Sequence, residues 1–178
     1  MIVDQDAAAD PALGRLQNAL RDVCRRLAAE PFCGYQVRVI HGSHGHLRGE
    51  LAAAGKLPRR APKRLVKTDD FATVLRGIRT SLRRDRELVQ TIATAEGLTA
   101  AQPAMVVFTA DPPMADLDAA EVFGDLAAEA AVVWVVPGAL EGLVSPAFAG
   151  VCGATVLGEH QAVADEVLDA ISGKALTS

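Results

Sequence analysis

Three histidines, His41, His44 and His46, stand close together in the glycine-rich stretch HGSHGH. Neighbouring imidazoles can bind Zn²⁺, but a zinc site normally needs four ligands in a tetrahedral arrangement. No cysteine or carboxylate lies at a spacing in the sequence that would complete such a set. We therefore interpret this stretch as a polar turn with exposed histidines.

The candidate nucleophiles lack the motifs that normally activate them. Ser145 lies in VSPAF, which is more typical of a turn than of the strand-to-helix elbow of a serine hydrolase. Three cysteines, Cys24, Cys33 and Cys152, form no metal-binding motif, and their odd number favours free thiols in a reducing compartment. No glycine-rich phosphate-binding motif follows a predicted strand. These observations do not favour an enzyme.

Charged residues separate along the sequence. Eleven of the eighteen lysines and arginines lie between residues 56 and 86, and none lies between residues 87 and 173, where acidic residues are frequent. The separation predicts a basic side and an acidic side. These are either solvated surfaces or docking surfaces for charged partners or for copies of the chain itself. Nucleic acid is a weaker candidate, because the acidic half would repel phosphate.

Residues 104–138 contain the central elements that would position any functional site. Two short β-branched runs, 105–108 and 131–136, are typical of strands buried on both faces of a parallel sheet, and Trp134 is then a core residue. Apolar residues at helical spacing lie between the runs. Strand, helix and strand form a right-handed crossover unit. Ligands of such sheets bind at the loops after the strands, which are residues 109–114 and 137–143.

The N-terminal part of the chain predicts a strand, a helix and a hairpin. Residues 1–10 hold a truncated first strand at Ile2 and Val3, followed by an acidic loop. Apolar spacing predicts an amphipathic helix over residues 11–30. Apolar and polar residues alternate over 35–40, which predicts a strand. Residues 47–51 are predicted to pair with it as the edge strand of a hairpin.

The remaining elements complete a single domain over residues 1–178. We predict a mobile basic loop over residues 52–67. We also predict a helix that is capped by Thr68 or Asp69 and whose apolar pattern continues toward Ile92. A last strand over 154–157 and a helix over 159–171 close the chain. Together these elements predict a three-layer α/β/α, Rossmann-like fold, with a mostly parallel sheet and one antiparallel edge hairpin.

The compartment is also predicted from composition. No apolar run approaches the roughly 20 residues that would span a bilayer. The N-terminal stretch MIVDQDAAAD lacks the basic region and the apolar region of a secretory signal. We therefore expect a cytoplasmic protein that has no membrane partner.

Several motifs, in their order along the chain, resemble a von Willebrand factor A-type (vWA) domain. VDQD forms an acidic loop after the first strand, and TDDFATVL resembles the Gly-Thr-Asp segment of that family. FTADPP stands where the family usually has Thr-Asp-Gly-x-Pro, and VVWVVPG resembles the strand after the next helix. The resemblance covers nearly the whole chain and implies a vWA-like form of the α/β fold.

The resemblance also implies a metal-ion-dependent adhesion site that is degenerate. The family usually holds Mg²⁺ or Mn²⁺ with an Asp-x-Ser-x-Ser segment, a threonine and a second aspartate, leaving a position open for a carboxylate of the partner. Here Asp6 and Ala8 replace the two serines, and Ala110 replaces the second aspartate. No tightly bound cofactor is therefore expected. If Mg²⁺ or Mn²⁺ binds, the candidate ligands are Asp4, Asp6, Thr68, Asp69 and Asp111.

The function that the resemblance implies is that of a non-enzymatic adaptor, similar to bacterial vWA-type proteins of multi-component assemblies. Its partners would be other proteins, or further copies of the chain. The candidate partner-binding residues are Arg76, Arg79, Arg83, Arg84, Pro112 and Pro113. The alternatives are a metal-dependent ligand-binding domain, a self-assembling structural subunit, and an enzyme or small-molecule binder at the same sheet edge.

Overall fold

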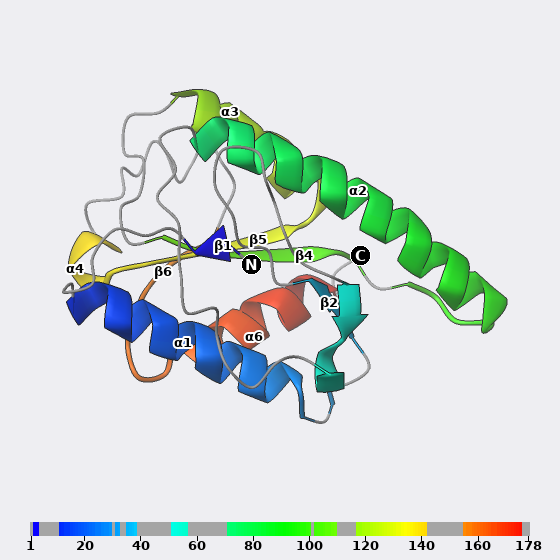
Figure 1. Cartoon of the computed structure of the whole chain (residues 1–178), viewed down its shortest axis with the longest axis horizontal. Helices are drawn as coiled ribbons and strands as arrows, with labels where there is room; N and C mark the ends of the chain where they lie inside the picture. The colour runs from blue at the N-terminus through cyan, green and yellow to red at the C-terminus, as the bar shows by residue number, and fades with distance from the viewer. Residues whose placement is uncertain are drawn as a thin grey trace.

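A parallel sheet of four strands lies at the centre of the computed structural model (Figure 1). Its strand order is β1-β4-β5-β6, and the strands are β1 (Ile2–Val3), β4 (Ala104–Phe108), β5 (Ala131–Val136) and β6 (Thr155–Gly158). The structure describes residues 2–3, 11–29, 31–32, 35–38, 51–56, 71–100, 102–109, 117–141 and 155–175. Within these ranges the predicted α/β class and the predicted parallel sheet are confirmed.

The short first strand is part of this sheet. Ile2 is the register partner of Val107, and Val3 is the register partner of Phe108, so β1 runs parallel to β4. The neighbouring ladder pairs Val107 with Trp134 and Phe108 with Val135. The prediction that Ile2 and Val3 form a strand is therefore confirmed, and the ends of β1 and β4 lie at the same edge of the sheet.

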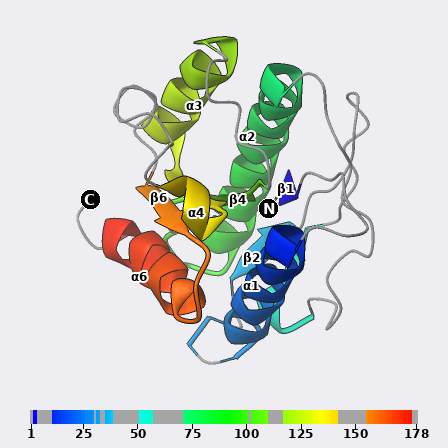
Figure 2. The same cartoon turned by 90° about the vertical axis from the view of Figure 1, so that its left-hand side faces the viewer.

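Helices cover both faces of the sheet (Figures 1 and 2). On one face, α2 (Phe71–Ala95) and α3 (Leu117–Glu129) pack on Met105, Val107 and Trp134. On the other face, α1 (Pro11–Leu27) and α6 (Val163–Ala175) pack on Phe108 and Val135. The short helix α4 (Gly138–Glu141) follows β5. Alternate residues of a strand point to opposite faces, so β4, β5 and β6 each contribute to both cores.

The centre of the core is β5, whose six residues are all buried. Trp134 stacks on Phe123 of α3 with ring centroids 5.0 Å apart, and Phe123 meets Phe71 of α2 at 5.8 Å. Offset aromatic pairs of this kind add to the stabilisation from buried apolar area. The prediction that Trp134 is a core residue is confirmed.

The hairpin differs from the prediction in its position. It consists of β2 (Gln36–Arg38) and β3 (Leu51–Ala53), and a 3-10 helix, η1 (Ala54–Lys56), follows. The return strand therefore starts at the end of the predicted 47–51 segment and enters the segment expected to be a loop. Residues 57–67 of that segment, and all three histidines of HGSHGH, lie outside the described residues.

The hairpin also forms its own sheet, rather than an edge of the parallel sheet. No ladder joins the two sheets in the described parts of the chain. Side chains attach the hairpin instead. Arg38 makes two hydrogen bonds to Asp85 of α2, at 2.6 and 2.7 Å, and Ala54 is buried in the core beside α1.

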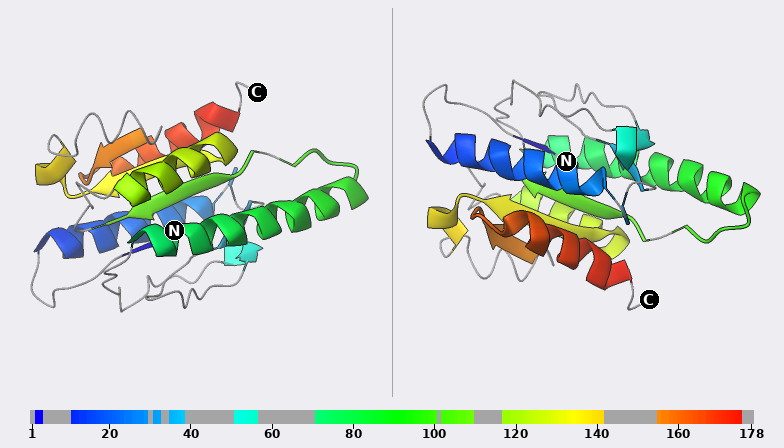
Figure 3. Two further views of the ribbon diagram at one scale, coloured as in Figure 1. Left: turned by 90° about the horizontal axis from the view of Figure 1, so that it is seen from above. Right: turned by 90° about the horizontal axis from the view of Figure 1, so that it is seen from below.

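The helix α2 is longer than the sheet needs. It has 25 residues, and its last buried residue is Ile78. Figure 3 shows its C-terminal half extending past α3 and the strands. Of the helices in the described ranges, α2 included, none is both long enough and apolar enough to cross a membrane.

Candidate functional site

The carboxyl edge of the parallel sheet is the candidate site, and Figure 2 faces it. Strand β1 leads into α1, whereas β4 leads into α3, and these two helices lie on opposite faces of the sheet. Since β1 and β4 are neighbours, the helices that follow two adjacent strands diverge to opposite faces of the sheet. Open α/β sheets bind ligands in the crevice that such a divergence creates.

Thr109 is the first residue after β4, and it is anchored inside the protein. Only 1% of it is exposed, its hydroxyl accepts a hydrogen bond from Trp134 Nε1 at 2.8 Å, and its backbone N–H donates to the carbonyl of Val135 at 3.1 Å. The hydroxyl is therefore committed to the core. Its role is to fix where the segment after β4 begins.

Glu159 was not singled out from the sequence as a site residue, yet it holds the other half of this edge together. It follows β6 directly and is buried, and its carboxylate accepts hydrogen bonds from Arg15 Nε of α1 and from the backbone N–H of Gly138. A Cβ at position 138 would lie 3.1 Å from the carbonyl oxygen of Glu159, which favours glycine there. The contacts connect the ends of β5 and β6 to α1. The one signal in the sequence was an acidic residue directly after a strand.

The predicted metal ligands Asp4, Asp6, Thr68, Asp69 and Asp111, and the predicted contact residues Pro112 and Pro113, lie outside the described residues. The structure does place their points of attachment. Asp4 follows Val3, and the segment with Asp111 follows Phe108, and these two strand residues are register partners. Among the described residues, no three histidine, cysteine, aspartate or glutamate side chains form a group that could hold a metal ion.

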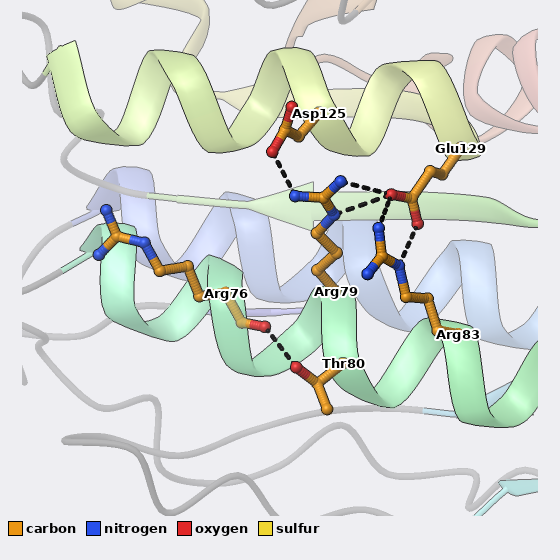
Figure 4. Close-up of polar contacts among 6 residues, drawn as sticks. All are labelled: Arg76, Arg79, Thr80, Arg83, Asp125 and Glu129. Carbon is orange, nitrogen blue, oxygen red and sulfur yellow. Dashed lines mark hydrogen bonds and ion pairs between the residues drawn. The ribbon is translucent and has the colours of Figure 1, made fainter.

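Two of the four predicted partner-binding arginines are engaged within the molecule (Figure 4). Arg79 pairs with Asp125 and donates to Glu129 Oε1 from Nε at 2.8 Å and from Nη2 at 2.6 Å. Arg83 Nε donates to Glu129 Oε2 at 2.9 Å. These arginines connect α2 to α3 and do not form a free basic face. Part of the charge separation seen in the sequence is therefore neutralised between two neighbouring helices.

The other two predicted arginines are exposed. Figure 4 shows the Arg76 guanidinium directed away from Asp125 and Glu129. Arg76 is exposed, and its backbone carbonyl accepts a hydrogen bond from the Thr80 hydroxyl at 3.1 Å. Arg84 is also exposed, two helical turns further along α2.

The arginines of the α2–α3 contact change the pKa of Glu129. Hydrogen bonds from Arg83 and then from Arg79 lower the pKa of Glu129 from 4.5 to about 2, because both arginines favour the charged carboxylate. The same hydrogen bond raises the pKa of Arg83. The group is therefore ionised at every pH at which the protein is expected to work, and it acts as a structural anion.

An open cleft of about 590 Å³ lies beside this contact. It is lined by Arg83, Arg86, Glu87, Gln90, Thr91 and Glu129. Small-molecule sites are mostly apolar with a few polar groups. All the lining side chains here are polar, Arg83 is engaged by Glu129, and the Thr91 hydroxyl donates to its own helix at 2.8 Å. The cleft offers no pair of nucleophile and base.

Cys24 is the cysteine that the structure describes, and it is partly buried on α1 against the core. Burial raises the pKa of its thiol. Since the thiolate is the reactive form, a raised pKa makes a cysteine a poorer nucleophile. Packing is the role that these contacts support.

Comparison of the chain with protein-family models, with curated proteins and with solved structures gives no match.

The α2–α3 contact should make stability depend on pH at the acidic end of the scale. Because the pKa of Glu129 is lower in the folded state, its contribution is present above about pH 4.5 and is lost as the pH falls toward about 2. We expect the urea midpoint of the wild type to fall more between about pH 5 and pH 2.5 than that of Glu129→Gln. Glu121→Gln, an exposed change on the same helix, is the control and should behave as the wild type. Identical pH profiles for the wild type and Glu129→Gln would contradict the assignment.

Proposed function

We propose that this chain is a non-enzymatic protein-interaction module with a three-layer α/β/α, Rossmann-like and vWA-like fold. It would act as an adaptor in a cytoplasmic, multi-component assembly of a bacterium. The observation that carries the proposal is the position of β1 beside β4. The helices after these two adjacent strands lie on opposite faces of the sheet, and the acidic and proline-containing segments follow the same two strands in the sequence.

Several features of the described residues support a binding role for this edge. Helices α1 and α2 have their N-terminal ends on the side that faces the viewer in Figure 2, and the positive ends of their dipoles favour acidic groups there. Thr109, held by Trp134, gives the segment after β4 a fixed starting point. A loop that departs from a rigid base loses less entropy on binding.

The internal pairing of Arg79 and Arg83 moves the proposed contact away from the middle of α2. Those two arginines bind Asp125 and Glu129, whereas Arg76 is exposed near the N-terminal end of the same helix. Pro112 and Pro113 would present the segment after β4 to a partner, since proline restricts the backbone. The proposed contact therefore combines this segment with Arg76.

Affinity capture from native cytosol at low salt tests the proposal. We expect the wild-type chain to retain a defined set of proteins and Pro112→Ala/Pro113→Ala to retain it at least about five-fold less, corresponding to the loss of about 1 kcal/mol of binding free energy. Pro31→Ala is the matched control, because Pro31 is exposed and follows the C-terminal end of α1, at the other end of that helix. Capture of the same set by all three proteins, or of nothing by the wild type, would contradict the proposal.

A metal-dependent form of the same site is the second candidate. It is favoured by the register of Val3 with Phe108, since Asp4 and the segment containing Asp111 follow these two residues. The replacement of both serines and of the second aspartate argues for weak binding at most.

This second candidate predicts thermal stabilisation by metal. If Mg²⁺ or Mn²⁺ binds the folded chain, millimolar metal should raise the melting temperature by a few degrees, because a ligand of the folded state stabilises it by mass action. Asp4→Ala should abolish the shift. A melting temperature that is unchanged by either metal would contradict metal binding and would leave the adaptor proposal intact.

A further inference from the structure

The C-terminal half of α2 contributes no buried residue to the core. No residue of α2 after Ile78 is buried, and Leu88 and Ile92 are 50% and 42% exposed. Figures 1 and 3 show this half extending beyond α3 and the sheet. Isolated helices shorter than about 12–15 residues are marginal in water, and most helical stability in proteins comes from packing of an apolar face. Among the described residues, ion pairs of Arg83 and Asp85 hold the start of this half, whereas its leucine and isoleucine are exposed, which points to a missing contact.

This half of the helix nevertheless has a defined end. Gly97 has a φ of 70°, and the backbone N–H of Leu98 donates to the carbonyl of Ala93 at 2.8 Å. A left-handed glycine followed by this hydrogen bond is a Schellman cap. The hydroxyls of Thr91 and Thr94 also donate to carbonyls of the preceding turn, at 2.8 Å each. The helix continues to its cap and does not fray after Ile78.

A row of four residues at four-residue spacing runs along this exposed half. It consists of Arg84, Leu88 and Ile92 of α2 and of Glu96, the residue directly after the helix, and all four are exposed. We call this row the α2 stripe. Side chains four residues apart form the ridges that interdigitate when two helices pack, with an axis crossing near −50°. The stripe thus has two apolar residues in the middle, a positive charge at one end and a negative charge at the other.

This order of residues is complementary to itself when reversed. If two stripes meet in opposite directions across a two-fold axis near Gln90, Leu88 of each copy faces Ile92 of the other. Arg84 of each copy then faces Glu96 of the other, so the apolar centre is flanked by two ion pairs. A two-fold interface requires this kind of self-complementary patch. We propose that the α2 stripe is the docking surface for a second copy of this chain.

The charges of neighbouring residues support a second copy as the occupant. Arg83 is engaged by Glu129, and Asp85 is engaged by Arg38, so the charges on either side of Arg84 are neutralised within one molecule. Arg84 and Glu96 form no ion pair with any other residue that the structure describes. They are the ends of the stripe, and the antiparallel arrangement pairs them with each other.

This surface is separate from the carboxyl edge proposed above. It lies on the C-terminal half of α2, whereas the edge is built around the ends of β1 and β4 (Figure 1). Failure of one proposal would therefore leave the other standing.

A charge-swap series measured by sedimentation velocity at low salt tests the inference. We expect the wild-type chain to be in a concentration-dependent equilibrium between monomer and dimer. Arg84→Glu and Glu96→Arg should each raise the dimer dissociation constant about ten-fold, because each replaces two attractive pairs by two repulsive ones. The double variant Arg84→Glu/Glu96→Arg should return it to within about three-fold of the wild type, since the pairs are restored in reverse.

Two further variants complete the series. Leu88→Ser/Ile92→Ser should abolish the dimer while circular dichroism at low concentration still shows a folded chain. Glu121→Arg on α3 makes the same charge change as Glu96→Arg at an exposed position off the stripe, and it should leave the dissociation constant unchanged. A wild type that stays monomeric at millimolar concentration would overturn the inference. So would a double variant as weak as the single ones.

Discussion

The structure depends on the burial of β5 from both sides. All six of its residues are buried, and alternate side chains enter the two cores, so helices must cover both faces of the sheet. Trp134 is the largest of these side chains. Its ring stacks on Phe123, and its N–H reaches the Thr109 hydroxyl. A buried donor without an acceptor costs about 1–3 kcal/mol, so this bond both completes the core and fixes the chain where it leaves β4.

Several polar side chains around this core are engaged within the molecule. Glu159 joins α1 to the ends of β5 and β6, and Arg79 and Arg83 join α2 to α3. These groups hold the scaffold together and are not offered to a partner. The carboxyl edge beside β1 and β4, and the exposed half of α2, are the two surfaces that we propose for recognition.

Much of the fold could be predicted from the sequence, because its strongest signals are local. The β-branched runs predict β4 and β5, and apolar residues at helical spacing predict α1 and α2. The position of the hairpin is harder to predict. Its return strand is Leu51, Ala52 and Ala53, where alanines carry no alternation between apolar and polar residues, so the predicted strand ended where the real one begins.

The polar contacts that the structure describes around the candidate surfaces are mostly long-range, and spacing in the sequence does not show them. Arg83 and Glu129 are 46 residues apart, and a basic run followed by an acidic run predicts two opposite sides as readily as two helices in contact. The buried carboxylate of Glu159 depends on Arg15, which is 144 residues away. The sequence predicts that the helix continues through Leu88 and Ile92. Only the structure shows that no described residue buries the stripe of Arg84, Leu88, Ile92 and Glu96.

On the proposed dimer, α2 is one helix in two environments, its first half in the core and its second half in an interface between two copies of the chain. Native-state hydrogen exchange of the wild-type chain at two protein concentrations, about 100-fold apart, tests it most directly. Amides of residues 71–82 should exchange equally slowly at both concentrations. Amides of residues 84–95 should become markedly more protected at the higher one. Protection of residues 84–95 that does not change with concentration would contradict the account.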